Sequence, residues 1–128
     1  MTIDKELANF GVPSEGERYG FAQAVKIGNA IYVSGQTASG DEPMGDMEAQ
    51  MRSAYGKIAQ ALEQFGATLD NVVDETLFVA DYMAAAMVAG RVRHDAYGGT
   101  PQVASTLIPV APFGSGEMLI EIKCIAHV

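Results

Sequence analysis

The feature that most constrains the fold is an amphipathic segment that follows Asp46. Its apolar side chains recur at spacings of three and four residues. They are Met47, Met51, Ala54, Tyr55, Ile58, Ala59, Leu62 and Phe65. This period predicts a helix with one buried face, because Asp46 is a typical N-cap and Gly66 a typical end. Such a stripe usually packs on the protein's own sheet, so we interpret it as core and not as a partner-binding face.

Segments typical of strands lie on both sides of this helix. Residues 21–27 alternate, and Gly28-Asn29 supplies a tight turn before the apolar run at 30–33, which predicts a hairpin. Further predictions are strands at 72–80, 102–110 and 117–128 and a second helix at 84–97 that ends before Gly98 and Gly99. The order is therefore ββαβαββ.

This order predicts an α+β domain over residues 20–128, with one mixed sheet and both helices on one face. Residues 1–19 are polar and contain Gly11, Pro13 and Gly16. We expect them to form an irregular N-terminal segment. A chain of 128 residues has room for one such domain with a sizeable core.

Composition excludes several function classes. Eight Lys and Arg against sixteen Asp and Glu give a net charge of −8, which opposes binding to nucleic acid and to anionic membranes. The single cysteine, Cys124, cannot close an intrachain disulfide, and two histidines are too few to suggest a zinc site. Because a signal peptide and a long apolar run are both absent, we expect a cytoplasmic protein with no membrane partner.

The predicted strand at 117–128 has two faces. Met118, Ile120, Ile122, Cys124 and Ala126 share one of them. The opposite face carries Leu119, Glu121, Lys123, Ile125 and His127, which is a mixture of apolar and charged side chains. Since a fully solvated face would be more polar, we predict that other copies of the chain cover it.

Three residue types invite chemical hypotheses. Ser34 lacks a marked base and is as well explained by a strand-end hydrogen bond, although Gly35 after it would allow a ligand close to the backbone. Glu121 either faces water beside Lys123 or lies in a site where burial raises its pKa and lets it transfer a proton. Arg91 and Arg93, two residues apart on a helix, point in different directions, and either both are solvated or one of them binds an anion.

Seven segments, in order over most of residues 20–128, carry a family resemblance. They are FAQAVKIGN at 21–29, IYVSGQ at 31–36, GDMEAQ at 45–50, LEQFGATLDNVV at 62–73, TLFVAD at 76–81, the segment at Pro101, and LIEIKCIA at 119–126. Together they resemble the reactive-intermediate deaminase (Rid, YjgF-like) family, also called endoribonuclease L-PSP.

The resemblance implies a chorismate-mutase-like fold and a homotrimer whose sheets form a central barrel, with small-molecule clefts between subunits. Its deaminase branch hydrolyses imines and enamines such as 2-aminoacrylate without a metal or organic cofactor. By this resemblance Glu121 is the catalytic residue that places the attacking water, and Ser34 and Gly35 line the cleft.

The chain departs from that branch where an arginine would hold the substrate carboxylate. Ala104 or Val103 stands at that position, followed by Thr106, and Phe21 stands where a tyrosine is common. Phe21, Ala104 and Thr106 are thus predicted cleft residues, and we hypothesise that Arg91 supplies the missing cation.

The first functional hypothesis is therefore a small-molecule-binding Rid-family protein that hydrolyses imines or enamines. The alternative is a non-catalytic metabolite sensor or chaperone-like trimer that uses the same cleft. Endoribonuclease activity is a third hypothesis, which the net charge of −8 disfavours.

Overall fold

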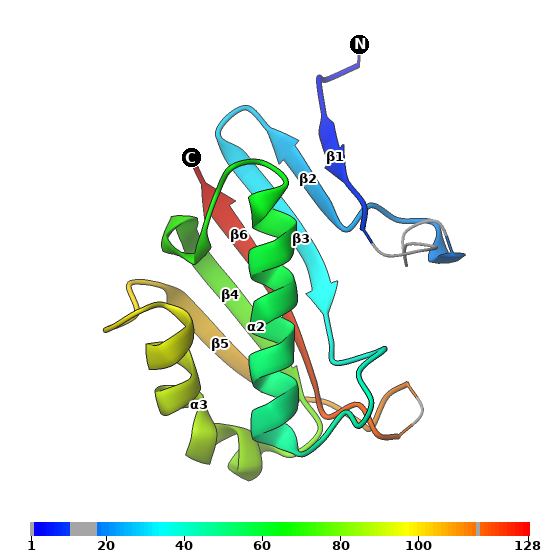
Figure 1. Ribbon diagram of the computed structural model, residues 1–128, viewed down its shortest axis with the longest axis vertical. Helices are drawn as coiled ribbons and strands as arrows, with labels where there is room; N and C mark the ends of the chain where they lie inside the picture. Colours follow the sequence, from blue (N-terminus) through cyan, green and yellow to red (C-terminus); the bar gives the residue numbers. More distant parts are fainter. Residues whose placement is uncertain (1, 11–17, 115) are drawn as a thin grey trace.

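Within residues 2–10, 18–114 and 116–128, which the computed structural model describes, six strands form one mixed sheet that two helices cover on one face (Figure 1). The elements are β1 (Glu6–Ala8), β2 (Ala24–Ile27), β3 (Ala30–Gln36), α2 (Met47–Glu63), the 3-10 turn η1 (Leu69–Asn71), β4 (Val72–Val79), α3 (Tyr82–Ala96), β5 (Ala104–Pro109) and β6 (Ile120–His127). The strand order is β1-β2-β3-β6-β4-β5. Only β4 and β5 run parallel among these pairs. The predicted α+β architecture is confirmed.

Helix α2 forms where the apolar stripe predicts it. The Asp46 carboxylate accepts a hydrogen bond from the Ala49 backbone N–H at 3.0 Å, which caps the first turn. After the last turn, Gly66 adopts a φ of 70°, a conformation that favours glycine. The stripe faces the sheet, and Met51, Ile58 and Leu62 are among the most deeply buried side chains. The interpretation of this stripe as core is confirmed.

Several boundaries differ from the sequence prediction. Strand β2 begins at Ala24 and not at residue 21. Within the segment predicted as irregular, Glu6–Ala8 pairs with β2 and adds an edge strand, although residues 1 and 11–17 lie outside the described part. Helix α3 begins at Tyr82 and not at residue 84, because Asp81 caps it by accepting from the Ala84 N–H. Strands β5 and β6 are shorter than predicted, since pairing stops where the connecting loop begins.

The two faces of the sheet have different environments. Ile120, Ile122 and Cys124 of β6 are buried beneath the helices and alternate with partly or fully exposed residues, as the sequence predicts. The opposite face is not covered within the described protomer, and it carries Glu121. The candidate site therefore lies on the side of the sheet away from α2 and α3.

Candidate functional site

Glu121 occupies a narrow space between β6 and a bulge in β3. The pairing of β3 with β6 shifts register between Val33 and Gln36, and Ser34 and Gly35 lie within this irregularity. A Cβ added at Gly35 would stand 2.5 Å from Cδ and 2.7 Å from Oε2 of Glu121. The side chain of Glu121 therefore packs directly on the backbone at position 35. Any larger residue at position 35 would require this side chain or the backbone to shift.

An apolar hollow of about 340 Å³ opens beside this carboxylate. Its lining residues are Phe78, Val110, Ala111, Phe113 and Glu121. We call it the Glu121 hollow. Phe78 lies directly opposite Glu121 in the β4–β6 pair, and Val110 continues the β4–β5 pairing by donating its N–H to the Val79 carbonyl. A single carboxylate thus borders a space whose other walls are hydrocarbon, the usual composition of small-molecule pockets.

The structure brings Gly35 to Glu121, and Ser34 adjoins this contact in the β3 bulge. The Ser34 hydroxyl donates to the Ala22 carbonyl at 2.7 Å, and its N–H donates to the Gln23 carbonyl at 2.8 Å. These bonds fasten the β3 bulge to the segment before β2. A positioning role in the bulge accounts for Ser34, whereas its predicted contact with a ligand stays a prediction.

The other predicted cleft residues are more distant along the sheet. Ala104 and Thr106 lie on β5, and β4 separates that strand from β6. In the register, Thr106 pairs with Thr76, which is opposite Lys123, so Thr106 lies two residue positions along the strands from the row that contains Glu121. Phe21 precedes β2 and is 40% exposed. Their predicted roles depend on a cleft that a neighbouring copy completes, and they stay predictions.

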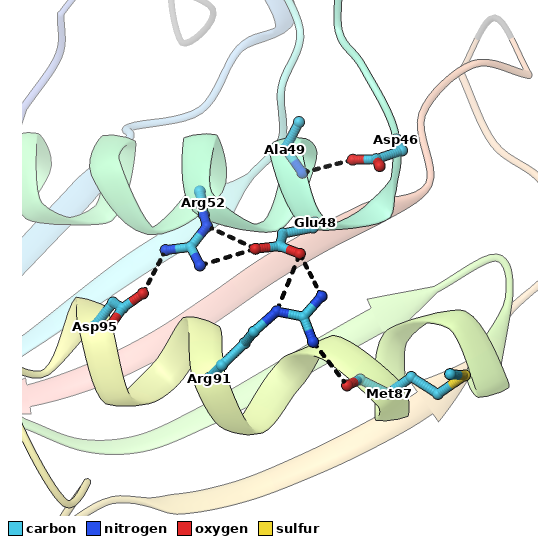
Figure 2. A network of polar contacts seen from close by, with 7 residues as sticks. All are labelled: Asp46, Glu48, Ala49, Arg52, Met87, Arg91 and Asp95. Atoms are coloured by element: carbon cyan, nitrogen blue, oxygen red, sulfur yellow. Dashed lines mark hydrogen bonds and ion pairs between the residues drawn. The ribbon is translucent and has the colours of Figure 1, made fainter.

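Arg91 is not near Glu121 within the protomer. Arg91 lies on α3, and the sheet lies between this helix and the face that carries Glu121. Its guanidinium group binds Glu48 of α2 (Figure 2). The Glu48 carboxylate also accepts from Arg52, which in turn binds Asp95 at 2.9 Å. The hypothesis that Arg91 supplies the missing cation has no support in this arrangement and stays a prediction only for a cleft shared between copies.

This surface network changes the acidity of its central carboxylate. Hydrogen bonds from Arg91 and then from Arg52 lower the pKa of Glu48 to about 2. In return, the same contacts raise the pKa values of both guanidinium groups. The network joins α2 to α3, and within the protomer it holds Arg91 on Glu48.

Sequence reasoning did not identify the most deeply buried charge, Glu75 of β4. This carboxylate is 0% exposed and accepts four side-chain hydrogen bonds. Tyr55 and Tyr97 donate to Oε1 at 2.8 and 2.6 Å, and Arg93 and Ser105 donate to Oε2 at 2.8 and 2.6 Å. Four donors satisfy both oxygens, which is what a buried carboxylate requires.

The pKa values of the donors follow from this environment. Burial raises the pKa of both Tyr55 and Tyr97, and the Glu75 carboxylate raises it further, so both phenols keep their protons. Burial by itself would lower the pKa of Arg93, but the charge and hydrogen bond of Glu75 outweigh it and raise the value. The cluster is a hydrogen-bonded network around the Glu75–Arg93 ion pair, and it links α2, β4, α3 and β5.

One signal in the sequence could have located this cluster. Glu75 has the same parity in β4 as Leu77 and Val79, which are buried, so strict alternation places it on the core face. A carboxylate on the core face requires a cationic partner such as Arg93. The sequence alone could not identify that partner, because it does not show how α3 crosses the sheet.

The described part of the chain contains neither a metal-binding cluster nor a membrane-spanning helix. Among residues 2–10, 18–114 and 116–128, no group of three or more His, Cys, Asp or Glu is arranged to hold a metal ion. No helix in this described part of the chain is both long and apolar enough to cross a membrane.

Comparison with known proteins connects the chain to a family. The family model described as endoribonuclease L-PSP matches residues 16–128. The chain belongs to this family. A RutC family protein of Pyrococcus abyssi is 30% identical over 111 residues, which cover 84% of this chain and 85% of the relative.

Solved structures of the family superpose over nearly the whole chain. A member of the YjgF family from Mycobacterium tuberculosis is 33% identical, with a TM-score of 0.82 and coverage of 98% of this chain and 100% of that one. RidA from an Antarctic Psychrobacter is 27% identical, with a TM-score of 0.75 and coverage of 100% and 99%. The family predicted from the sequence motifs is therefore confirmed.

Proposed function

We propose that this member of the family is a homotrimeric hydrolase of small imines or enamines, with Glu121 as its catalytic residue. The observation that carries the proposal is the carboxylate of Glu121, packed against Gly35 at the edge of an apolar hollow of about 340 Å³. The space suits a small molecule, and the carboxylate is placed to handle a proton beside it.

The uncovered face of the sheet supports assembly. Leu7, Val25, Tyr32 and Ile125 follow one another in register across β1, β2, β3 and β6. Leu7 is 60% exposed and Tyr32 is 44% exposed, so an apolar row crosses the face that the helices do not cover. Covering such a row with other copies removes apolar surface from water. Glu121 lies on the same strand and face as Ile125 of this row, so we propose that the assembly also brings a neighbouring subunit to the Glu121 hollow.

The proposed reaction is a hydrolysis that needs one acid–base group. The imine reacts in its protonated form. The oxygen of a water molecule adds to the iminium carbon while one water proton passes to Glu121, and a neutral carbinolamine forms. Glu121 then returns that proton to nitrogen, and the C–N bond breaks as the hydroxyl proton is lost through Glu121 to the departing ammonia, so that the products are a carbonyl compound and an ammonium ion. A positioned carboxylate contributes about 10²- to 10⁴-fold to such proton transfers.

The family description names a ribonuclease, but the features of this chain do not favour that activity. The net charge of −8 repels a phosphate backbone. Four of the five residues that line the Glu121 hollow are apolar, and the fifth is an acid, so the hollow has no group that attracts phosphate.

The experiment measures ammonia release from imines that an amino-acid or amine oxidase generates in the same reaction. We expect the protein to accelerate release over the spontaneous rate and Glu121→Gln to remove the acceleration. Glu63→Gln, a change of the same charge on the exposed end of α2, should keep it. Light scattering should give about 40 kDa, three times the 13.5 kDa of one chain.

Two results would contradict the proposal. A monomer at micromolar concentration removes the shared cleft. No acceleration across a broad panel of imines, together with specific metabolite binding by calorimetry, identifies a sensor instead of an enzyme.

A further inference from the structure

We infer that the Glu121 hollow selects imines that carry no carboxylate, such as those formed by oxidation of simple amines, over imines of amino acids. The inference rests on the proposed hydrolytic function and names its substrate class. It follows from what lines the hollow and from where the cations of the protomer lie.

The walls of the hollow offer hydrocarbon and one negative charge. Phe78 and Phe113 contribute two phenyl rings, Val110 and Ala111 contribute aliphatic surface, and Glu121 contributes the carboxylate. None of these lining residues is a Lys or Arg. A substrate carboxylate in this space would lose its hydration, gain no opposite charge and lie near a like charge.

Several cations of the chain already bind groups outside the hollow. Arg52 and Arg91 bind Glu48, Arg93 binds Glu75, and Lys57 donates to the carbonyls of Thr37 and Ser39. These four are half of the eight Lys and Arg in the chain. Moving any of them to the hollow would break at least one of these contacts.

Lys123 is the cation on the same strand and face as Glu121, but it is displaced from the hollow. Two residues along a strand span about 6.7 Å. Lys123 lies opposite Thr76, whereas Glu121 lies opposite Phe78, and Lys123 is not a lining residue. The charge that the hollow itself presents is therefore negative.

A protonated imine without a carboxylate matches these walls. Its positive charge is attracted by Glu121 and by the faces of the two phenyl rings, and its hydrocarbon part fills apolar space. One iminium ion and one water give one carbonyl compound and one ammonium ion, so the step needs no oxidant or reductant. A volume of about 340 Å³ lies at the small end of the range for ligand pockets, roughly 300–1,000 Å³.

The test uses two imines with the same benzyl group. An amine oxidase converts 2-phenylethylamine to the imine of phenylacetaldehyde, and an amino-acid oxidase converts phenylalanine to the corresponding 2-imino acid. Ammonia release above the spontaneous rate gives kcat/KM for each. We expect the amine-derived imine to be preferred by at least about tenfold, the effect of one missing charge-assisted contact.

A substitution in the wall provides the second measurement. Ala111→Arg places a guanidinium group at the hollow, and we expect it to shift the preference toward the imino acid by about tenfold or more. Ala86→Arg adds the same charge on the exposed side of α3 and should leave the preference unchanged.

The outcomes separate the two proposals. Preference for the imino acid, or equal rates, overturns the substrate class while hydrolysis by Glu121 stands. Acceleration of neither imine by correctly folded protein overturns the proposed function and the substrate class together. If Ala86→Arg shifts the preference as far as Ala111→Arg does, the net charge of the protein sets the selectivity. That result also overturns the role of the hollow as the selecting site.

Discussion

The contact between Gly35 and Glu121 yields the most direct prediction. In Gly35→Ala the new methyl group would stand 2.5 Å from Cδ of Glu121, whereas ordinary contact begins at 3.4 Å. The carboxylate or the β3 bulge must therefore move by about 0.9 Å. A misplacement of about 1 Å at a reacting group costs about 10²-fold in rate, and overpacking of this kind costs about 1–3 kcal/mol of stability.

The assay for this variant is kcat/KM for imine hydrolysis together with urea unfolding. We expect kcat/KM to fall about 10²-fold and the free energy of unfolding to fall by about 1–3 kcal/mol. Gly56→Ala is the matched control, because a Cβ there meets nothing within 4 Å and helix α2 should gain about 0.5–1 kcal/mol. The reasoning fails if Gly35→Ala retains the activity and stability of the parent protein.

Three other predictions concern the polar clusters and the thiol. Glu75→Ala leaves Arg93 without its buried partner, so unfolding in urea should show a loss of about 3–5 kcal/mol, and a loss below about 1 kcal/mol contradicts the role of this pair. The pKa of Glu48 is lowered from 4.5 to about 2, so its contribution to stability is complete above pH 4.5 and is lost as the pH falls toward 2. The fall in Tm over that range should be smaller in Glu48→Gln than in the parent, and equal falls would refute this. Burial raises the pKa of the Cys124 thiol to about 12, so a thiol reagent at pH 8 should label it only after unfolding, and rapid labelling of the native protein would be inconsistent with the structure.

Local sequence patterns predicted those elements whose period, cap and terminating residue all lie within the element itself or next to it. The stripe before Gly66 defines α2 because its period, cap and end agree. The alternation around Ile122 defines both faces of β6 for the same reason. The turn at Gly28 was predicted from its position between two apolar segments, and in the structure Ile27 and Ala30 pair on either side of it.

Elements that depend on distant partners were predicted less well. The strand Glu6–Ala8 is only three residues long, and its pairing with β2 has no local signature. The contact of Gly35 with Glu121 joins residues 86 positions apart through a bulge, so the motif at 33–36 could indicate a close approach but not its occupant. The four donors around Glu75 come from elements whose relative placement no local pattern contains.

The cluster around Glu75 has a consequence for how α3 is held in place. The fully buried side chains of α3 are Ala85, Ala89 and Val92, whose smooth surface would let a helix slide or rotate on the sheet with little loss of contact. Arg93 and Tyr97, at the end of the helix, donate directional hydrogen bonds to Glu75. These bonds fix the rotation of α3 about its axis and its position along that axis. Among related chains, the orientation of this helix should therefore change when the residues that hydrogen-bond to the position of Glu75 change. It should not depend on the size of the residues at the positions of Ala85 and Ala89.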